Sequence, residues 1–173
     1  MRYFQESILS GLVPFIWKQA NVIPVPKVHP PVAIETDIRP ISLTSTVSKI
    51  LESFVGQWIL NYVVSNLDRR QYGGIKGRST THALVDMLHH WHQALDDNKN
   101  VRVLFIDYAK AFDHVDHTRF IDKLQRDFNV PTILLKWLCS FLSNRHQRVK
   151  IGDIVSEWAS LMAAYLKDLG SVL

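Results

Sequence analysis

The sequence predicts an α+β fold, and three observations lead to it. Two short runs of β character, residues 22–27 and 38–43, precede segments in which apolar residues recur every three or four positions, as on one face of a helix. A third β run, residues 101–106, separates two groups of such segments. The chain has 173 residues, of which 47% are hydrophobic and 21% charged, so it can bury a core and does not have the composition of a disordered tail.

The first elements expected are a helix and a β-hairpin. Residues 4–17 carry a helical apolar stripe that a proline interrupts. Pro24 and Pro26 stand two residues apart in the first strand, so their missing N–H groups fall on one side, as an edge strand allows. Residues 28–37 are turn-like, and residues 38–43 are expected to return alongside the first strand.

The next expected elements are two helices joined by a polar loop. The helical period is clearest over residues 46–64. A polar, glycine-containing loop follows at 66–79. A second helix is predicted over residues 80–95, and Ser79 is a suitable N-cap for it.

The remaining elements begin with a turn at residues 96–100 and the β run at 101–106, which is apolar enough for a buried strand. A helix is predicted over residues 117–127, and Pro131 opens another. A second β-hairpin is expected within residues 147–158, around a Gly-Asp turn.

The net charge of +4 is unevenly distributed along the chain. Up to Arg78 there are nine Lys and Arg against five Asp and Glu, whereas from Ser79 onward there are eleven of each. A basic first part followed by a balanced part suits a partner with phosphates. Alternatively, this charge on a chain of this length is only what solubility requires.

Several functional classes are excluded or disfavoured. The single cysteine, Cys139, excludes an intramolecular disulfide framework and a cysteine-rich zinc fold, and its apolar neighbours favour a place in the core. His82, Asp86, His89 and His90 have helical spacing but no zinc signature, so they are interpreted as surface residues. No membrane-spanning run and no signal-peptide pattern is found, which leads us to expect an intracellular protein.

The most informative stretch is residues 105–117, which contains Asp107, Asp113 and Asp116. Asp107 follows the predicted strand, where an α/β sheet usually presents its reactive groups, and its carboxylate could bind Mg²⁺. Each aspartate also has a structural alternative. Asp107 could simply end the strand, and Asp116 is a natural N-cap for the helix that follows.

Two further groups of residues could meet phosphates. If the first two strands pair, Lys27 and Arg39 can face one substrate from one hairpin, although either could also be an ordinary surface charge. The loop at residues 71–81 contains Lys76 and Arg78 and leads into a helix N-terminus. It fails the Walker pattern in spacing and in its basic residue, but a loop of this kind can still contact a phosphate backbone.

Taken together, these stretches resemble the reverse transcriptases of non-LTR, LINE-like retrotransposons. The motifs occur in the order of that family, and the likeness extends to about Trp158. They are Trp17-Lys-Gln-Ala-Asn-Val-Ile-Pro24, Asp37-Ile-Arg-Pro-Ile-Ser-Leu43, Gln71-Tyr-Gly-Gly-Ile-Lys-Gly-Arg-Ser-Thr-Thr81 and Phe105-Ile-Asp-Tyr-Ala-Lys-Ala-Phe-Asp113.

The resemblance implies an incomplete right-hand polymerase fold. Residues 1–100 would be a fingers-like region, and residues 101–173 a partial palm that is truncated near the Pro-Gln-Gly motif of the family. Asp168 and Leu169 stand where that motif has Pro and Gln. The Tyr-x-Asp-Asp motif that carries the remaining catalytic aspartate does not occur in these 173 residues.

The resemblance also implies roles for individual residues. Asp107 would be the catalytic aspartate and, with the main-chain carbonyl of Tyr108, would bind the two Mg²⁺ ions. Phe112 would be the steric gate under the nucleotide sugar. Arg39 and Lys27 would contact the incoming triphosphate.

Lys76 and Arg78 would lie near the template or on the surface of the fingers. The implied partners are an RNA template, a DNA primer and deoxynucleoside triphosphates, with the missing palm and thumb as a further partner. Because only one catalytic aspartate is matched, we expect the chain alone to be inactive as an RNA-directed DNA polymerase. The alternatives are a non-catalytic nucleic-acid-binding module and a non-functional retrotransposon relic.

Overall fold

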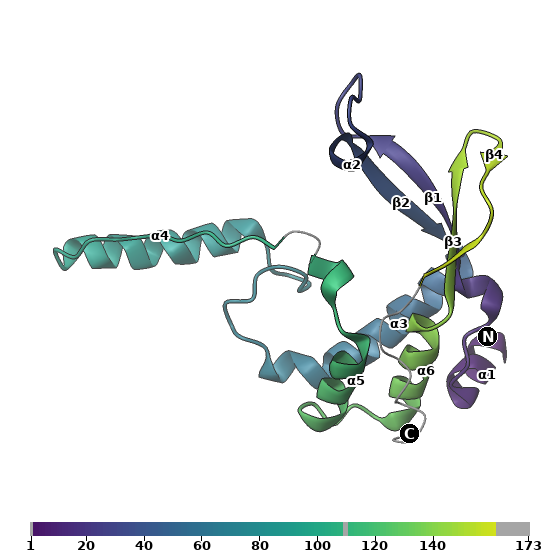
Figure 1. Cartoon of the computed structure of the whole chain (residues 1–173). Coiled ribbons are helices and arrows are strands. Elements are labelled where there is room, and N and C mark those ends of the chain that lie inside the picture. Colours follow the sequence, from purple (N-terminus) through teal and green to yellow (C-terminus); the bar gives the residue numbers. More distant parts are fainter. Residues whose placement is uncertain (1, 109–110, 162–173) are drawn as a thin grey trace. The chain divides into compact units, whose positions relative to one another are not determined.

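A computed structural model of the protein describes residues 2–108 and 111–161, and these form the mixed α+β fold that the sequence predicts (Figure 1). The elements are, in chain order, α1 Arg2–Ser10, η1 Phe15–Lys18, β1 Gln19–Pro26, α2 Ile34–Asp37, β2 Ile38–Thr44, α3 Thr46–Val63, η2 Val64–Asn66, α4 Thr80–Asp96, η3 Ala111–His114, α5 His117–Arg126, α6 Thr132–Leu142, β3 Arg145–Ile151, β4 Ile154–Val155 and β5 Ala159–Leu161. The η elements are short 3₁₀-helices.

The chain divides into two compact units. The larger unit comprises residues 2–63 and 115–161 of the described chain, and the smaller unit comprises residues 64–108 and 111–114. The larger unit contains all of the strands and five of the six α-helices found in the described ranges. The expected division at residue 100 into a fingers-like and a palm-like region stays a prediction.

The sheet has the strand order β2-β1-β3-β4, and β5 also pairs with β3. β1 and β2 form the predicted antiparallel hairpin, in which Pro24 faces Pro40. β1 is central in this order, yet its parallel pairing with β3 ends at Val22. Pro24 is the next residue of β1 whose backbone is directed toward β3, and it has no N–H to donate. The prolines therefore leave the second half of β1 without a partner on the β3 side.

The helices end where the sequence supplies residues that tolerate left-handed backbone conformations. α1 ends at Gly11, with φ of 68°, and α4, α5 and α6 are followed by Asn98, Asn129 and Asn144, with φ between 50° and 56°. At Gly11 a Cβ atom would lie 3.0 Å from the Cβ of Lys136, so the missing side chain also allows α1 to approach α6.

The core of the larger unit lies among α1, α3, α5 and α6. Its buried members are Val13, Leu51, Val55, Ile121, Leu124, Val130, Leu134, Leu135 and Trp137. The indole N–H of Trp137 donates to the Ser7 hydroxyl at 3.0 Å, and that hydroxyl donates to the Leu12 carbonyl at 2.6 Å. Each buried polar group of this contact therefore has a partner, and the contact joins α6 to α1.

The predicted caps are also found. The Ser79 hydroxyl accepts a hydrogen bond from the His82 N–H, and the Asp116 carboxylate accepts one from the Arg119 N–H. Asp116 therefore takes the structural alternative, as the N-cap of α5. The second hairpin is shorter than expected, because β4 ends at Val155 and β5 contributes a separate pairing to β3.

The predicted strand at residues 101–106 is not formed, so this prediction is wrong. Leu104, Phe105 and Ile106 are 82%, 80% and 70% exposed, and residues 101–108 have no regular structure. A strand forms only when its backbone groups find a neighbouring strand, and no described segment pairs with this one. The apolar composition of this segment suits a buried strand, but composition alone does not provide the neighbouring strand that it needs.

None of the described helices is both long and apolar enough to span a bilayer.

Loss of packing in the core should be easily measured at Leu135, whose side chain on α6 is fully buried. We expect Leu135→Ala to lower the free energy of unfolding by about 2–5 kcal/mol, because it removes buried methyl groups and leaves a cavity. Urea denaturation followed by tryptophan fluorescence measures this. The matched control is Leu9→Ala on α1, a leucine that is 66% exposed. Equal losses in the two variants would contradict this description of the core.

Candidate functional site

The β1–β2 hairpin places Lys27 and Arg39 on one face of the sheet. Arg39 lies opposite Val25, and residues directly opposite in an antiparallel pair share a face. Lys27 comes two residues after Val25, and its N–H still donates to the Asp37 carbonyl at 2.7 Å, so alternation puts its side chain on the same face. Both side chains are exposed. The structure therefore brings these two predicted residues together.

The tip of this hairpin is held by Asp37. Its carboxylate accepts hydrogen bonds from the N–H groups of Val32 and Ala33, at 2.9 and 3.0 Å, and from the Thr36 hydroxyl at 2.9 Å. These bonds, from Ala33 first, and the nearby charge of Lys27 hold the pKa of Asp37 below its usual range. The Lys27 ammonium donates to the Thr36 carbonyl at 2.7 Å. Lys27 is thus anchored to an ordered turn.

The same sheet face continues onto β3. Arg148 lies beside Asn21 in the parallel pairing, in the row that also contains Leu43, and Lys150 follows two residues later on the same side. We call Lys27, Arg39, Arg148 and Lys150 the basic face. None of the five strands contains an Asp or a Glu.

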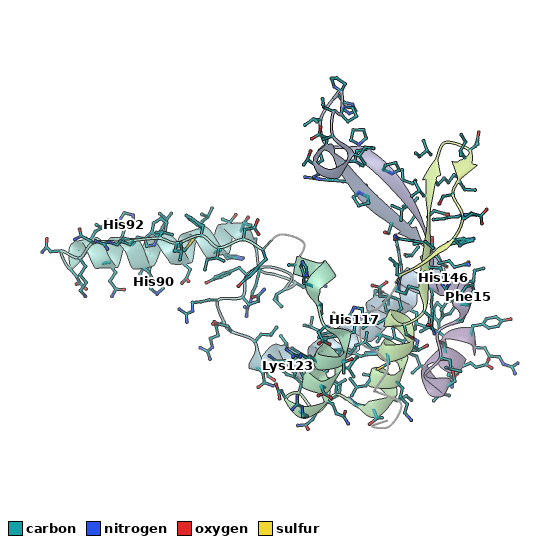
Figure 2. The ribbon with its side chains drawn as sticks, viewed as in Figure 1. Phe15, His90, His92, His117, Lys123 and His146 are labelled. Atoms are coloured by element: carbon teal, nitrogen blue, oxygen red, sulfur yellow. The ribbon has the colours of Figure 1, made fainter. Side chains whose placement is uncertain are left out.

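Sequence reasoning missed Arg148 and Lys150. The signal that could have found them was a strand with a basic residue at every second position and no acidic one, within residues 145–151. Figure 2 shows His146, from the same strand, lying next to Phe15, and their ring centroids are 5.0 Å apart. The Ser160 hydroxyl oxygen is 3.1 Å from Nε2 of His146.

Arg78, in the smaller unit, has a structural contact. Its Nη1 atom donates to the carbonyls of Gln71, Arg69 and Asp68, at 2.7, 2.9 and 3.3 Å. One guanidinium nitrogen thus gathers three carbonyls of its own loop. Lys76, two residues earlier, is exposed. The two basic residues of this loop therefore differ, with Arg78 fastening the loop and Lys76 facing solvent.

The same loop is attached to α4. Partial burial, followed by a hydrogen bond to the Asp86 carboxylate, raises the pKa of Tyr72. Asp86 lies on α4 and is also 3.6 Å from Nδ1 of His90. Figure 2 shows His90 and His92 projecting from different sides of this helix. Of the predicted group, His82, His89 and His90 are exposed, which agrees with their interpretation as surface residues.

Asp107 and Tyr108 lie at the end of the exposed segment 101–108, and both are exposed. The side chains of Phe112 and Asp113 lie outside the described part of the structure, as do Gly170–Leu173 and the residues just before them. Within residues 2–108 and 111–161, no group of three or more His, Cys, Asp or Glu is close enough together to hold a metal ion. The described donors therefore do not fit a complete magnesium centre.

Cys139 is half-buried beside the core, and burial raises the pKa of its thiol. A raised pKa keeps the sulfur protonated, which is the opposite of what a nucleophile needs. This agrees with the prediction that Cys139 serves packing.

Comparison with known proteins decides the family. Residues 25–161 match the family described as reverse transcriptase (RNA-dependent DNA polymerase). The chain belongs to this family. It is also similar to three Drosophila melanogaster proteins: the probable RNA-directed DNA polymerase from transposon BS (31% identical over 142 residues), the probable RNA-directed DNA polymerase from transposon X-element (26% over 172 residues) and the RNA-directed DNA polymerase from mobile element jockey (27% over 172 residues).

These matches confirm the predicted likeness to the non-LTR retrotransposon enzymes. The three alignments cover 81%, 98% and 98% of this chain. They cover only 16%, 18% and 18% of the relatives, so the chain spans less than a fifth of those proteins. Members of this family generally use divalent metal ions.

The contacts of Arg78 lead to a prediction about its loop. We expect Arg78→Lys to speed hydrogen exchange of the backbone amides of residues 71 and 78 about tenfold. A lysine keeps the charge, but its ammonium ends one bond short of Nη1, the nitrogen that bonds all three carbonyls. Those two amides donate to the carbonyls of Asp68 and Ile75. Lys76→Gln is the control, and it should leave both rates unchanged. Equal protection in wild type and Arg78→Lys would show that Arg78 does not fasten the loop.

Proposed function

We propose that this chain supplies the nucleotide- and nucleic-acid-contacting part of a non-LTR retrotransposon RNA-directed DNA polymerase. The observation that carries the proposal is the basic face, in which Arg39, Arg148 and Lys150 lie on described strands that hold no carboxylate and Lys27 directly follows β1. Such a surface attracts phosphates, and the carboxylate beside it, that of Asp37, is already bonded to the N–H groups of Val32 and Ala33. Its partners would be an RNA template, a DNA primer and deoxynucleoside triphosphates.

Within this proposal, Arg39 and Lys27 contact the incoming triphosphate. A guanidinium offers paired donors for phosphate oxygens, and an ammonium acts as a point charge. The shared face of the two side chains supports the assignment, since one triphosphate could meet both. We retain the expected division into a fingers-like region at residues 1–100 and a partial palm from residue 101.

Nucleotide addition would depend on residues outside the basic face. The resemblance assigns metal binding to Asp107 and the Tyr108 carbonyl, and the steric gate to Phe112. Two Mg²⁺ ions about 3.5–4 Å apart need carboxylates from more than one element. Asp107 is the one catalytic aspartate that the motifs match, and the Tyr-x-Asp-Asp sequence does not occur among the 173 residues. We therefore propose that this chain alone does not extend a primer.

A second candidate is a nucleic-acid-binding module without catalysis. It is favoured by the same basic face, which needs no metal to bind phosphates. The exposed apolar run before Asp107 instead favours a part that functions only with a partner, or a relic without one, because three large apolar side chains stand in solvent. In the first case, the missing palm and thumb would be that partner.

Primer extension tests the proposal on catalysis. With Mg²⁺, deoxynucleoside triphosphates, an RNA template and a DNA primer, we expect no extension by the purified chain, because one matched carboxylate does not hold both ions. Asp107→Ala should then bind the primed template as tightly as wild type. Robust incorporation by wild type that is lost in Asp107→Ala, and kept in Asp153→Ala as a surface control, would overturn the proposed inactivity.

A salt series tests the proposal on binding. With no triphosphate present, Lys27 and Arg39 can contact strand phosphates together with Arg148 and Lys150. Four phosphate contacts on a single strand give a slope of about −3 when the logarithm of the binding constant is plotted against that of the salt concentration. We expect the double variant Lys27→Gln/Arg39→Gln to reduce this slope by about half. Fluorescence anisotropy with a labelled single strand provides the measurement. Negligible binding at low salt, or a flat plot, would reject a role in nucleic-acid contact.

A further inference from the structure

Arg148 has an aromatic partner at the centre of the sheet. Its guanidinium carbon lies 4.6 Å from the ring centroid of Trp158, which places the cation over the ring. Its Nε donates to the Asn21 side-chain oxygen at 2.8 Å. Arg148 is therefore held from two sides, by β1 and by the segment between β4 and β5.

The position of Trp158 is fixed by hydrogen bonds just before it. The Ser156 N–H donates to the Val149 carbonyl at 2.9 Å, and the Val149 N–H donates to the Ser156 hydroxyl at 2.9 Å. β5 begins directly after Trp158 and pairs with β3 through Ala159 and Gln147. The backbone on both sides of Trp158 is thus fastened to β3, and the contact with Arg148 orients its ring.

The remaining surface of this pair faces solvent. Trp158 is 39% exposed, although Arg148 covers part of its ring. The hydrogen bond to Asn21 uses Nε of Arg148, and among the described residues the terminal guanidinium nitrogens have no hydrogen-bond acceptor. Lys150 stands on the same face of β3, two residues further. An aromatic surface and two cations with free donors therefore lie side by side.

We propose that Trp158 and Arg148 form a base-stacking platform for single-stranded nucleic acid. An unpaired base would stack on the exposed part of the Trp158 ring, while Arg148 and Lys150 would neutralise the adjoining phosphates. Only an unstacked base offers its face to an aromatic side chain, so a single strand fits and a duplex does not. This inference rests on the proposed function and assigns it two residues that the motif comparison did not.

The charges around the platform agree with an anionic ligand. The nearest acidic residues along the chain, Asp153 and Glu157, lie outside the strands. The stacked arginine would meet a phosphate without first having to be ordered, because Asn21 and Trp158 already hold it. Preorganisation of this kind strengthens binding by lowering its entropic cost.

The experiment compares two labelled single strands that carry the same phosphates. One is oligothymidine, and the other is an abasic oligonucleotide of equal length, each titrated with the full 173-residue chain at low salt. We expect Trp158→Ala to weaken binding of oligothymidine about tenfold and binding of the abasic strand much less, because only the base stacks and Asn21 still holds Arg148. Trp158→Phe keeps an aromatic ring and should restore most of the affinity.

Arg148→Gln should weaken binding of both strands and reduce the salt slope by about one, since it removes a phosphate contact. The charge-matched control is Arg119→Gln on α5, whose side chain is 88% exposed and which lies outside the sheet. It should change neither affinity nor slope.

The outcomes separate the two proposals. If wild type binds neither strand, the proposed function fails and the platform with it. If wild type binds both strands but Trp158→Ala binds oligothymidine as tightly as wild type does, the platform alone is wrong. Equal losses on both strands in Trp158→Ala, with no rescue by Trp158→Phe, would mean that the tryptophan acts only through the fold.

Discussion

The sheet depends on one stacked arrangement that joins it to the helices. Trp137 is almost fully buried, and its ring lies parallel to that of Phe141, with centroids 5.2 Å apart and an interplanar angle of 11°. The Arg145 guanidinium lies 4.7 Å from the Phe141 centroid and donates to the Phe141 carbonyl at 3.1 Å. That carbonyl belongs to the last turn of α6, where backbone acceptors lack partners within the helix. Arg145 therefore caps α6 and begins β3 in the same contact.

This contact has a cost that its surroundings offset. Burial lowers the pKa of Arg145, and the nearby Glu52 carboxylate opposes that shift. Lys18 lies close by, and its pKa is lowered by burial and then by the charge of Arg145. The Ser140 hydroxyl provides Lys18 with a hydrogen bond at 3.3 Å. The site tolerates two cations because Arg145 is stacked and bonded to a helix end with Glu52 nearby, and Lys18 donates to the Ser140 hydroxyl.

The position of β3 determines where the basic face lies. Because Arg145 is fixed at the start of the strand, Arg148 falls three residues later, beside Asn21 of β1. A shift of one residue would move Arg148 and Lys150 to the opposite face. The prolines of β1 then limit the β3 pairing to the first half of that strand, which leaves the Lys27 end of the hairpin projecting (Figure 1). The basic face thus follows from a core contact and from the prolines of a single strand.

Local sequence patterns predicted most of the elements, because the residues in each pattern act directly on neighbouring backbone groups. The cap at Ser79, the cap at Asp116 and the prolines of the first hairpin each act on backbone groups only a few residues away. The β run at 101–106 could not be judged in this way, since a strand depends on a neighbour that is remote in the sequence.

In the candidate site, too, the sequence predicted the arrangements that depend on nearby residues and missed those that depend on remote ones. Lys27 and Arg39 were placed correctly on one face, because the pairing of their strands could be read from two adjacent runs. Arg148 was missed, because its neighbour Asn21 is more than a hundred residues away. For Arg78 the sequence showed a basic residue in a loop but not the three carbonyls that it binds.

The described residues therefore form the whole basic face, whereas they leave the backbone around Asp107 without packing partners. The basic face is complete within one unit, with its register, its hydrogen bonds and its charge balance in place. Asp107 instead follows three apolar side chains in solvent, whose burial would stabilise a folded strand by roughly 5–9 kcal/mol. A carboxylate positions a metal ion only when the backbone that carries it is held. For this chain, whatever covers residues 104–106 would therefore also fix Asp107, so strand formation and metal binding at that aspartate should be coupled.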